Sequence, residues 1–189
     1  MLYHLIGEES ELRLLQYQHA EALYNLIMQN REHLGRWLPW IDEYNTVNSL
    51  YYYIRDSLEA FSKGTELPLT VWHQSELAGM VGLYEIRLHH RKAQIGYWLG
   101  ESFQGKGLIY RSIRALLAHA FTELGLGRVE IQVASHNPRS RAVPERLGFK
   151  PEGVLRQAFI VRQEVQDLVV YGMTLQDWFA FQASLVEFS

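Results

Sequence analysis

The chain has 189 residues, of which 48% are hydrophobic and 21% charged, a balance that excludes intrinsic disorder and predicts a single folded domain over residues 1–189. It contains no cysteine, which excludes a thiol nucleophile, a cysteine-ligated zinc and an iron–sulfur cluster. No apolar stretch approaches the roughly 18 residues of a membrane span. We therefore expect a cytoplasmic protein that does not associate with a membrane.

The formal net charge of -3 arises from 18 basic and 21 acidic residues that are unevenly distributed. Residues 87–162 hold 13 Lys/Arg and 5 Asp/Glu, a net charge of +8, whereas the remainder holds 5 and 16, a net charge of -11. Folding could intermix the two segments in space. If it does not, the first favours an anionic ligand and the second a cationic one.

The N-terminal part of the chain reads as a strand followed by helices. Residues 11–15 alternate in polarity like a strand, and apolar side chains recur at helical spacing within residues 17–30. A loop with two tryptophans follows at residues 37–40. Thr46 is suited to cap a second helix, which we place at residues 50–61.

The middle of the chain combines a hairpin, a third strand and a long helix. Residues 67–73 and 77–86 flank a polar Gln-Ser turn and predict the hairpin. Residues 94–99 predict the third strand of this group. A periodic apolar set beginning at Leu108 then predicts a helix that ends near Gly125.

The same alternation continues to the C-terminus. Residues 129–134 predict a strand and residues 138–147 a short helix, before a second hairpin of residues 155–161 and 165–174. A last helix is expected over residues 175–188, with Thr174 and Asp177 as its capping box. Strands and helices that alternate in this way predict a mixed α/β fold.

A glycine-spaced turn separates the strand at residues 94–99 from the following helix. Gly105 and Gly107 allow the backbone to turn tightly, and the first N–H groups of a helix have no partner within it. Together with the charge of Lys106, this arrangement predicts an anion site suited to a pyrophosphate. The alternative is an ordinary helix entry in which the glycines serve packing.

A second polar stretch opens the helix at residues 138–147. Asn137 is suited to cap this helix, and Pro138 takes its first position. Pro144 lacks the N–H that would bond the Ser140 carbonyl, so the helix is locally open beside a hydroxyl group. Taken alone, this stretch is typical of a structural helix cap.

Together, at this separation and in this order, the two stretches resemble the GNAT acetyltransferase superfamily over nearly the whole chain. Gln104 and Gly107 match the signature Gln/Arg-x-x-Gly-x-Gly/Ala, in which Ile109 replaces the last small residue. The sequences Ile-Gly-Tyr-Trp-Leu at 95–99 and Glu-Ser-Phe-Gln-Gly at 101–105 are similar to the serine-specific ribosomal-protein N-acetyltransferases, where a larger aliphatic residue at the last signature site is familiar. The stretches at 34–40, 137–140, 152–153 and 167–171 also resemble that group.

The resemblance implies the GNAT fold, in which helices flank a mixed, mostly antiparallel central sheet that splays at a cofactor cleft. It also implies acetyl-coenzyme A as the co-substrate. The strand backbone at Trp98 and Leu99 would hold the pantetheine arm and the acetyl carbonyl, where an N–H group stabilises the developing oxyanion. The backbone amides of the turn would bind the pyrophosphate: Gln104, Gly105, Lys106, Gly107, Leu108 and Ile109.

The resemblance also assigns roles at the second stretch. Asn137 would contact the pantetheine, and Ser140 would hydrogen-bond the sulfur and protonate the leaving thiolate. The family pattern does not supply a general base, because Gln94 and Phe159 stand where relatives have carboxylates. Glu85 and Asp167 are the remaining candidates for the base, and each is alternatively a solvated or ion-paired carboxylate. His136 has a suitable titration range, but its place beside the cofactor arm favours a structural hydrogen bond.

The acceptor mouth in relatives is lined by the loop that holds Trp37, Trp40, Asp42 and Glu43 here. Aromatic rings beside carboxylates suit a cationic amine, although the tryptophans could instead only anchor the loop on the core. The neighbouring His89 and His90 have no third ligand at suitable spacing, so we expect no metal site. Of the three adjacent tyrosines at 51–53, we expect one ring in the core and the others at the surface or an interface.

Three functions follow from this reading. The first is direct acetyl transfer to the N-terminal α-amino group of a protein, perhaps a ribosomal one, without an acyl-enzyme because no cysteine is present. The second is acetylation of a small amine, which a short and closed acceptor pocket would favour. The third is an inactive sensor that only binds acetyl-coenzyme A. An anionic donor and a cationic acceptor fit the charge pattern better than nucleic acid, and a homodimer is expected by analogy alone.

Overall fold

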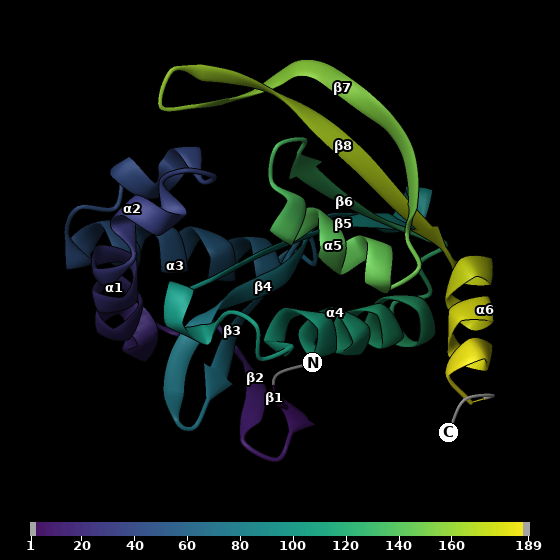
Figure 1. Ribbon diagram of the computed structural model, residues 1–189. Coiled ribbons are helices and arrows are strands. Elements are labelled where there is room, and N and C mark those ends of the chain that lie inside the picture. The colour runs from purple at the N-terminus through teal and green to yellow at the C-terminus, as the bar shows by residue number, and fades with distance from the viewer. Residues whose placement is uncertain (1–2, 187–189) are drawn as a thin grey trace.

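The structure is a computed structural model that describes residues 3–186. The protein is built around one eight-stranded sheet (Figure 1). The strand order is β1-β2-β3-β4-β5-β6-β8-β7, and every neighbouring pair is antiparallel except β5 and β6. The strands are β1 (Tyr3–Gly7), β2 (Ser10–Leu14), β3 (Leu67–His73), β4 (Glu76–Arg87), β5 (Lys92–Leu99), β6 (Arg128–Ala134), β7 (Lys150–Val161) and β8 (Glu164–Thr174).

The helices flank this sheet, and the long β7/β8 hairpin arches past α5 toward the group formed by α1, α2 and α3 (Figure 1). The helices are α1 (Ala20–Gln29), α2 (Arg31–Leu34), α3 (Val47–Ser62), α4 (Leu108–Ala118), α5 (Pro138–Arg146) and α6 (Leu175–Val186). Short 3-10 turns lie at Tyr17–His19, Pro39–Asp42, Leu88–His90 and Glu101–Phe103, and a π turn lies at His119–Glu123. Among the described residues, no helix is long and apolar enough to span a membrane.

The sheet opens between its two parallel strands. Strands β5 and β6 pair only through Lys92, Ala93 and Gln94, which lie opposite residues 128–130. Beyond Gln94 the two strands diverge, so β5 has no partner on its β6 side from residue 95 onward. The expected splay of a mostly antiparallel sheet is therefore confirmed.

Apolar side chains that point alternately from the strands make the core continuous across the sheet. Leu12, Leu69 and Leu83 are fully buried on the strands, and Ile113 on α4 packs into the same core cluster. The ring of Phe121 stacks on that of Trp178 at 6.1 Å, which joins the end of α4 to α6. Ile95 of β5 and Ile131 of β6 belong to the same cluster, so both strands at the opening are anchored in the core.

Several elements match the sequence-based prediction. Strand β3 has the predicted bounds, and Thr46 caps α3 through a bond from the Ser49 N–H at 3.2 Å. The predicted capping box of α6 is present, because Thr174 N–H donates to Asp177 Oδ2 at 3.0 Å and Asp177 N–H donates to Thr174 Oγ1 at 3.2 Å. The predicted end of this helix at Phe188 lies outside the described residues.

Other elements differ from the prediction, and most strands and helices begin or end a few residues from the predicted bounds, with β7 starting at Lys150 and not at 155. Strand β1 was not expected, because its sequence has no regular alternation that distinguishes it from a loop. The predicted helix at 17–30 begins as a 3-10 turn, so α1 covers only Ala20–Gln29. It ends because the Asn30 side chain bonds two other partners, donating to Leu26 O and accepting from Glu101 N–H, each at 2.8 Å.

Candidate active site

The turn before α4 has the geometry of an anion site. Gly105 and Gly107 adopt φ angles of 77° and 69°, a left-handed backbone that strongly favours glycine. Gly107 is the N-cap of α4, and no side chain caps the helix. The first N–H groups of an 11-residue helix are thus left to a ligand, at the positive end of its dipole. The residues of this turn fit a pyrophosphate.

The side chain of Gln104 braces this turn against two other elements. Its Nε2 lies 2.7 Å from His33 Nε2 on α2, and its Oε1 accepts a hydrogen bond from Arg139 on α5. Its backbone N–H donates to Glu101 O at 3.2 Å. Burial lowers the pKa of His33, which keeps the ring neutral. The amide and its two neighbours therefore position the turn, a role for His33 and Arg139 that no sequence pattern indicated.

Ser140 lies across the opening from β5 and is tied to it by Tyr97. The Tyr97 hydroxyl donates to the Ser140 carbonyl at 2.9 Å, and the Ser140 hydroxyl donates to the Tyr97 oxygen at 3.1 Å. Burial raises the pKa of Tyr97, so its hydroxyl stays protonated. Asn137 accepts from the Ser140 N–H at 3.1 Å and caps α5 as expected.

The strand positions predicted to hold the co-substrate lie at the free side of β5. Trp98 and Leu99 pair with Met80 and Gly79 of β4, and neither residue pairs with β6. Their backbone groups on the open side are therefore available to a ligand. The Trp98 ring meets the Trp40 ring edge to face at 6.2 Å, so the strand is also anchored to the loop before α3.

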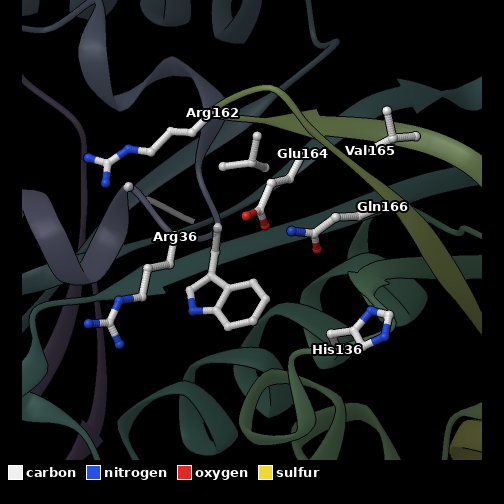
Figure 2. A pocket seen from close by; sticks show the side chains of 9 residues that line it. Arg36, His136, Arg162, Glu164, Val165 and Gln166 are labelled. Atoms are coloured by element: carbon white, nitrogen blue, oxygen red, sulfur yellow. The ribbon is translucent and has the colours of Figure 1, made fainter.

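A cavity of about 590 Å³ lies where this loop region, the β7/β8 hairpin and the start of α5 meet (Figure 2). It is lined by Gly35, Arg36, Trp37, His136, Val161, Arg162, Glu164, Val165 and Gln166. Trp37 lies at this cavity, and its part in acceptor binding stays a prediction. His136 directly precedes Asn137, so one wall of the cavity continues into the start of α5.

The tip of the β7/β8 hairpin borders this cavity and docks on α2 and the following loop. Arg162 forms ion pairs with Glu32 at 3.4 Å and with Asp42 at 3.6 Å. Arg31 holds the same Asp42 carboxylate at 3.2 Å. A Cβ atom on Gly35 would clash with the Arg162 guanidinium, so a larger residue there would displace this side chain.

Two polar side chains of β8 extend into the cavity. Figure 2 shows that Glu164 and Gln166 point into the space between Arg36 and His136, whereas the guanidinium groups of Arg36 and Arg162 are directed to one side. Within residues 3–186, the Glu164 carboxylate has no hydrogen bond or ion pair. The cavity therefore presents an unpaired negative charge, which sequence reasoning missed because Glu164 sits beside a hairpin turn, where charged residues are common.

The two predicted general bases do not line the cavity. Glu85 is exposed at a bulge of β4, where its carboxylate pairs with Arg87 at 2.8 Å. Asp167 accepts a hydrogen bond from the Gln157 N–H at 2.8 Å and stabilises a bulge of β7. Each carboxylate thus has a structural partner. Their role as base stays a prediction, which these contacts do not support.

The other predicted acceptor residues have different surroundings. The Trp40 ring packs on Trp98 and on Tyr44, at 5.3 Å from the latter, so it anchors the loop on the core. Asp42 holds the hairpin tip through Arg162, and Glu43 is exposed. None of the three lines the cavity. Their part in acceptor binding stays a prediction.

The remaining sequence features can also be placed. Gln94 lies opposite Tyr84 and Glu130 at the last pairing before the sheet opens, and half-buried Phe159 lies opposite Gln166. The rings of His89 and His90 contact each other at 4.1 Å. In the part of the chain that the structure describes, no group of three or more His, Cys, Asp or Glu side chains is arranged to hold a metal ion.

Comparison with known proteins connects this geometry to one family. Residues 10–150 match the model of the acetyltransferase (GNAT) domain. The chain is 36% identical over 174 residues to the putative ribosomal N-acetyltransferase YdaF of Bacillus subtilis, covering 92% of this chain and 95% of that protein. It is 30% identical over 167 residues to the ribosomal-protein-serine acetyltransferase of Escherichia coli, covering 88% of this chain and 93% of the relative.

A solved structure is similar in fold over the same length. The ribosomal α-N-protein acetyltransferase RimL, in complex with coenzyme A, superimposes with a TM-score of 0.89 at 27% identity. The match covers 93% of this chain and 99% of RimL.

Proposed function

Because this chain belongs to the GNAT acetyltransferase family and is an N-acetyltransferase, we propose that it transfers the acetyl group of acetyl-coenzyme A to the N-terminal α-amino group of a protein. The observation that carries this proposal is the cavity at Trp37, which abuts the start of α5 where Ser140 lies. An acceptor held in that cavity would reach the opening of the sheet from the side opposite to the anion site.

The donor side of the proposal rests on the opening between β5 and β6. The free N–H groups at the start of α4 would bind the pyrophosphate, with Gly105 and Gly107 keeping the approach clear. The β5 backbone at Trp98 and Leu99, which pairs with β4 but has no β6 partner, would hold the pantetheine arm and the acetyl oxygen. A backbone N–H aimed at that oxygen would stabilise the negative charge that develops on it during attack.

The proposed reaction is a direct transfer. The neutral amine attacks the acetyl carbonyl, an N–C bond forms and the C–S bond breaks. The Ser140 hydroxyl would donate a proton to the leaving sulfur, and the proton that the amine loses balances this transfer overall. In the structure the Ser140 hydroxyl donates to the Tyr97 oxygen at 3.1 Å, so its proton would turn from Tyr97 to the sulfur in this step, while Tyr97 would keep the serine at the opening through its bond to the Ser140 carbonyl. An α-amino group with a pKa near ~8 needs only modest help to lose its proton at neutral pH.

We assign Glu164 a role in binding the acceptor. Its unpaired carboxylate would attract the cationic amine into the cavity, and Trp37 would pack on the acceptor chain. A ribosomal protein is the acceptor that the names of the two relatives favour for this chain. The acidic remainder of the chain, with its net charge of -11 from 5 basic and 16 acidic residues, is compatible with a basic partner of that kind.

The test measures the rate at which the free thiol of coenzyme A is released from acetyl-coenzyme A in three separate reactions, each with a different acceptor. One is a peptide with a free N-terminus and no lysine, the second is the same peptide with a blocked N-terminus, and the third is a small diamine. We expect turnover with the free peptide and background rates with the blocked one. Equal rates for the two peptides would contradict the proposed acceptor, and no binding of acetyl-coenzyme A by calorimetry would contradict the proposed donor site.

The second candidate acceptor is a small amine. The observation in its favour is the hairpin tip, which Arg162 fixes over the cavity through Glu32 and Asp42 and which limits the entry of a long chain. Faster turnover of the diamine than of the free peptide would favour this candidate.

A further inference from the structure

A second cavity, of about 390 Å³, lies between α3, the residue that precedes β3 and strand β4, and it shares no lining residue with the cavity at Trp37. Four tyrosines and two carboxylates dominate its lining, and we call it the tyrosine pocket. These residues are Tyr44, Tyr52, Tyr53, Asp56, Glu66 and Tyr84. No Lys, Arg or His side chain contributes to the lining.

The floor of the tyrosine pocket is aromatic and neutral. Burial raises the pKa of Tyr53 and that of Tyr84, and it raises the pKa of Tyr44 to about 12. All three side chains line the pocket and stay uncharged at physiological pH. Electron-rich rings of this kind attract cations, and the attraction grows when the cation is desolvated.

Glu66 gives the tyrosine pocket a negative charge that no described residue neutralises. This carboxylate is half-buried, and among the described residues it has neither a hydrogen bond nor an ion pair. Its pKa is raised by burial, and no neighbouring cation opposes that shift. Asp56 at the rim is instead exposed and pairs with Arg55 at 2.7 Å. A half-buried carboxylate without a partner costs stability, which a bound cation would recover.

From these contacts we propose that the tyrosine pocket binds the terminal ammonium group of an aliphatic amine. Glu66 would supply the charge, and the rings of Tyr53 and Tyr84 would supply cation–π contacts. An anion is disfavoured because both charged lining residues are acidic. A metal ion is disfavoured because its preferred sites offer more oxygen ligands than two carboxylates and the phenol groups provide. This site does not depend on the acceptor proposed above.

The tyrosine pocket is connected to the strand at the opening by a row of rings. Tyr53 contacts Tyr44 at 5.5 Å, Tyr44 contacts Trp40 at 5.3 Å, and Trp40 contacts Trp98 at 6.2 Å. All three contacts are edge to face, so a shift of Tyr44 on ligand binding would change the surroundings of the Trp40 indole. Tryptophan fluorescence therefore gives a readout of binding that needs no activity.

The experiment is isothermal titration of the full chain, without acetyl-coenzyme A, with 1,5-diaminopentane and with 1,5-pentanediol as its uncharged counterpart. We expect saturable binding of the diamine, with a change in tryptophan fluorescence, and no binding of the diol. Glu66→Gln should weaken diamine binding by about tenfold, since one desolvated charge contact of roughly 1.4 kcal/mol is lost. Glu76→Gln, which changes an exposed carboxylate on β4, should leave the affinity unchanged.

Two further variants test whether the diamine binds in the tyrosine pocket or in the cavity at Trp37. Glu164→Gln alters only the other cavity and should leave the diamine affinity of the tyrosine pocket unchanged, and Asp56→Asn should weaken that affinity by about twofold, as for an exposed carboxylate. Should Glu66→Gln fail to fold, Glu66→Ala, which also removes the charge, replaces it as the test and should weaken diamine binding by at least the same factor. Absence of saturable binding, an unchanged affinity in the Glu66→Gln variant, or loss of binding in Glu164→Gln alone would overturn the proposal.

Discussion

The Tyr97 hydroxyl donates a hydrogen bond to the Ser140 carbonyl at 2.9 Å, and the Ser140 hydroxyl donates one to the Tyr97 oxygen at 3.1 Å. The carbonyl is free to accept because Pro144, four residues later, has no N–H to donate. A proline inside α5 thus allows a tyrosine of β5 to hold the serine across the opening of the sheet.

Loss of the Ser140 hydroxyl should reduce turnover more than loss of the Tyr97 hydroxyl. We expect Ser140→Ala to lower kcat by about 10²-fold or more, because a general acid typically contributes 10²–10⁴-fold. Tyr97→Phe should lower kcat by about tenfold, since the serine keeps its hydroxyl but loses the bond from Tyr97 to its carbonyl that holds it at the opening. Steady-state kinetics with acetyl-coenzyme A held in excess measures both effects.

The pair of variants also provides its own control. In the double variant Ser140→Ala/Tyr97→Phe, the effect on kcat should be no larger than that of Ser140→Ala alone, because the tyrosine acts through the serine. Independent, multiplicative effects of the two substitutions would show that Tyr97 does not act through Ser140.

Gly105 and Gly125 form a matched pair for the anion site. Both have positive φ angles, 77° and 64°, and a Cβ on either would meet no atom within 4 Å. Alanine at either position should therefore lower the free energy of unfolding by about 1 kcal/mol, because a left-handed backbone is unfavourable for a residue with a Cβ atom. Only Gly105→Ala should also weaken acetyl-coenzyme A binding, by about tenfold, because its methyl group lies at the turn before α4. Calorimetry and thermal unfolding separate the two effects, and equal affinities in the two variants would argue against a pyrophosphate at this turn.

Arg162 should control entry of the acceptor. We expect Arg162→Ala to change KM for the acceptor by several-fold while leaving KM for acetyl-coenzyme A unchanged, because its partners Glu32 and Asp42 lie on the acceptor side. Gly35→Ala should produce a similar change, since a methyl group there displaces the same guanidinium. Arg55→Ala removes an exposed arginine on α3 and is the control. A change in both KM values would instead indicate a general disturbance of the fold.

Asp177 should make the stability of α6 depend on pH. Hydrogen bonds from Lys150 and from Thr174 lower the pKa of Asp177 to about 2. Because the folded value lies below the unfolded one, the stabilisation is present above about pH 4 and is lost as the pH falls toward the folded pKa. Asp177→Asn should therefore cost about 1–2 kcal/mol at neutral pH and progressively less below about pH 4. Urea unfolding at several pH values measures this, and a constant difference down to the lowest pH would contradict it.

The sequence predicts most of the fold because its signals there are local. The capping residues Thr46 and Asn137, and the left-handed glycines before α4, lie next to the elements that they define. The divergence of β5 and β6, in contrast, is predicted from the family resemblance and not from any local sequence pattern. The parallel pairing at residues 92–94 is long-range, and nothing in the alternation of either strand fixes where it stops.

The candidate site could be predicted only on its donor side. Arg162 belongs to the basic segment by sequence, yet it pairs with Glu32 and Asp42 of the acidic remainder, because the hairpin brings its tip to α2. The two segments therefore meet at the cavity. The unpaired Glu164 was not foreseen for the same reason, since its exposure to a cavity depends on where the hairpin ends.

The most direct test of the proposed activity is the position of the acetyl group on a peptide that carries both a free N-terminus and an internal lysine. The wild-type protein and acetyl-coenzyme A are incubated with this peptide, and the product is sequenced by tandem mass spectrometry, with Ser140→Ala as the control for uncatalysed transfer. We predict acetylation of the α-amino group only, reduced to near the uncatalysed rate in the variant. Acetylation of the lysine ε-amino group, or no transfer above the uncatalysed rate, would contradict N-terminal acetyl transfer by this protein.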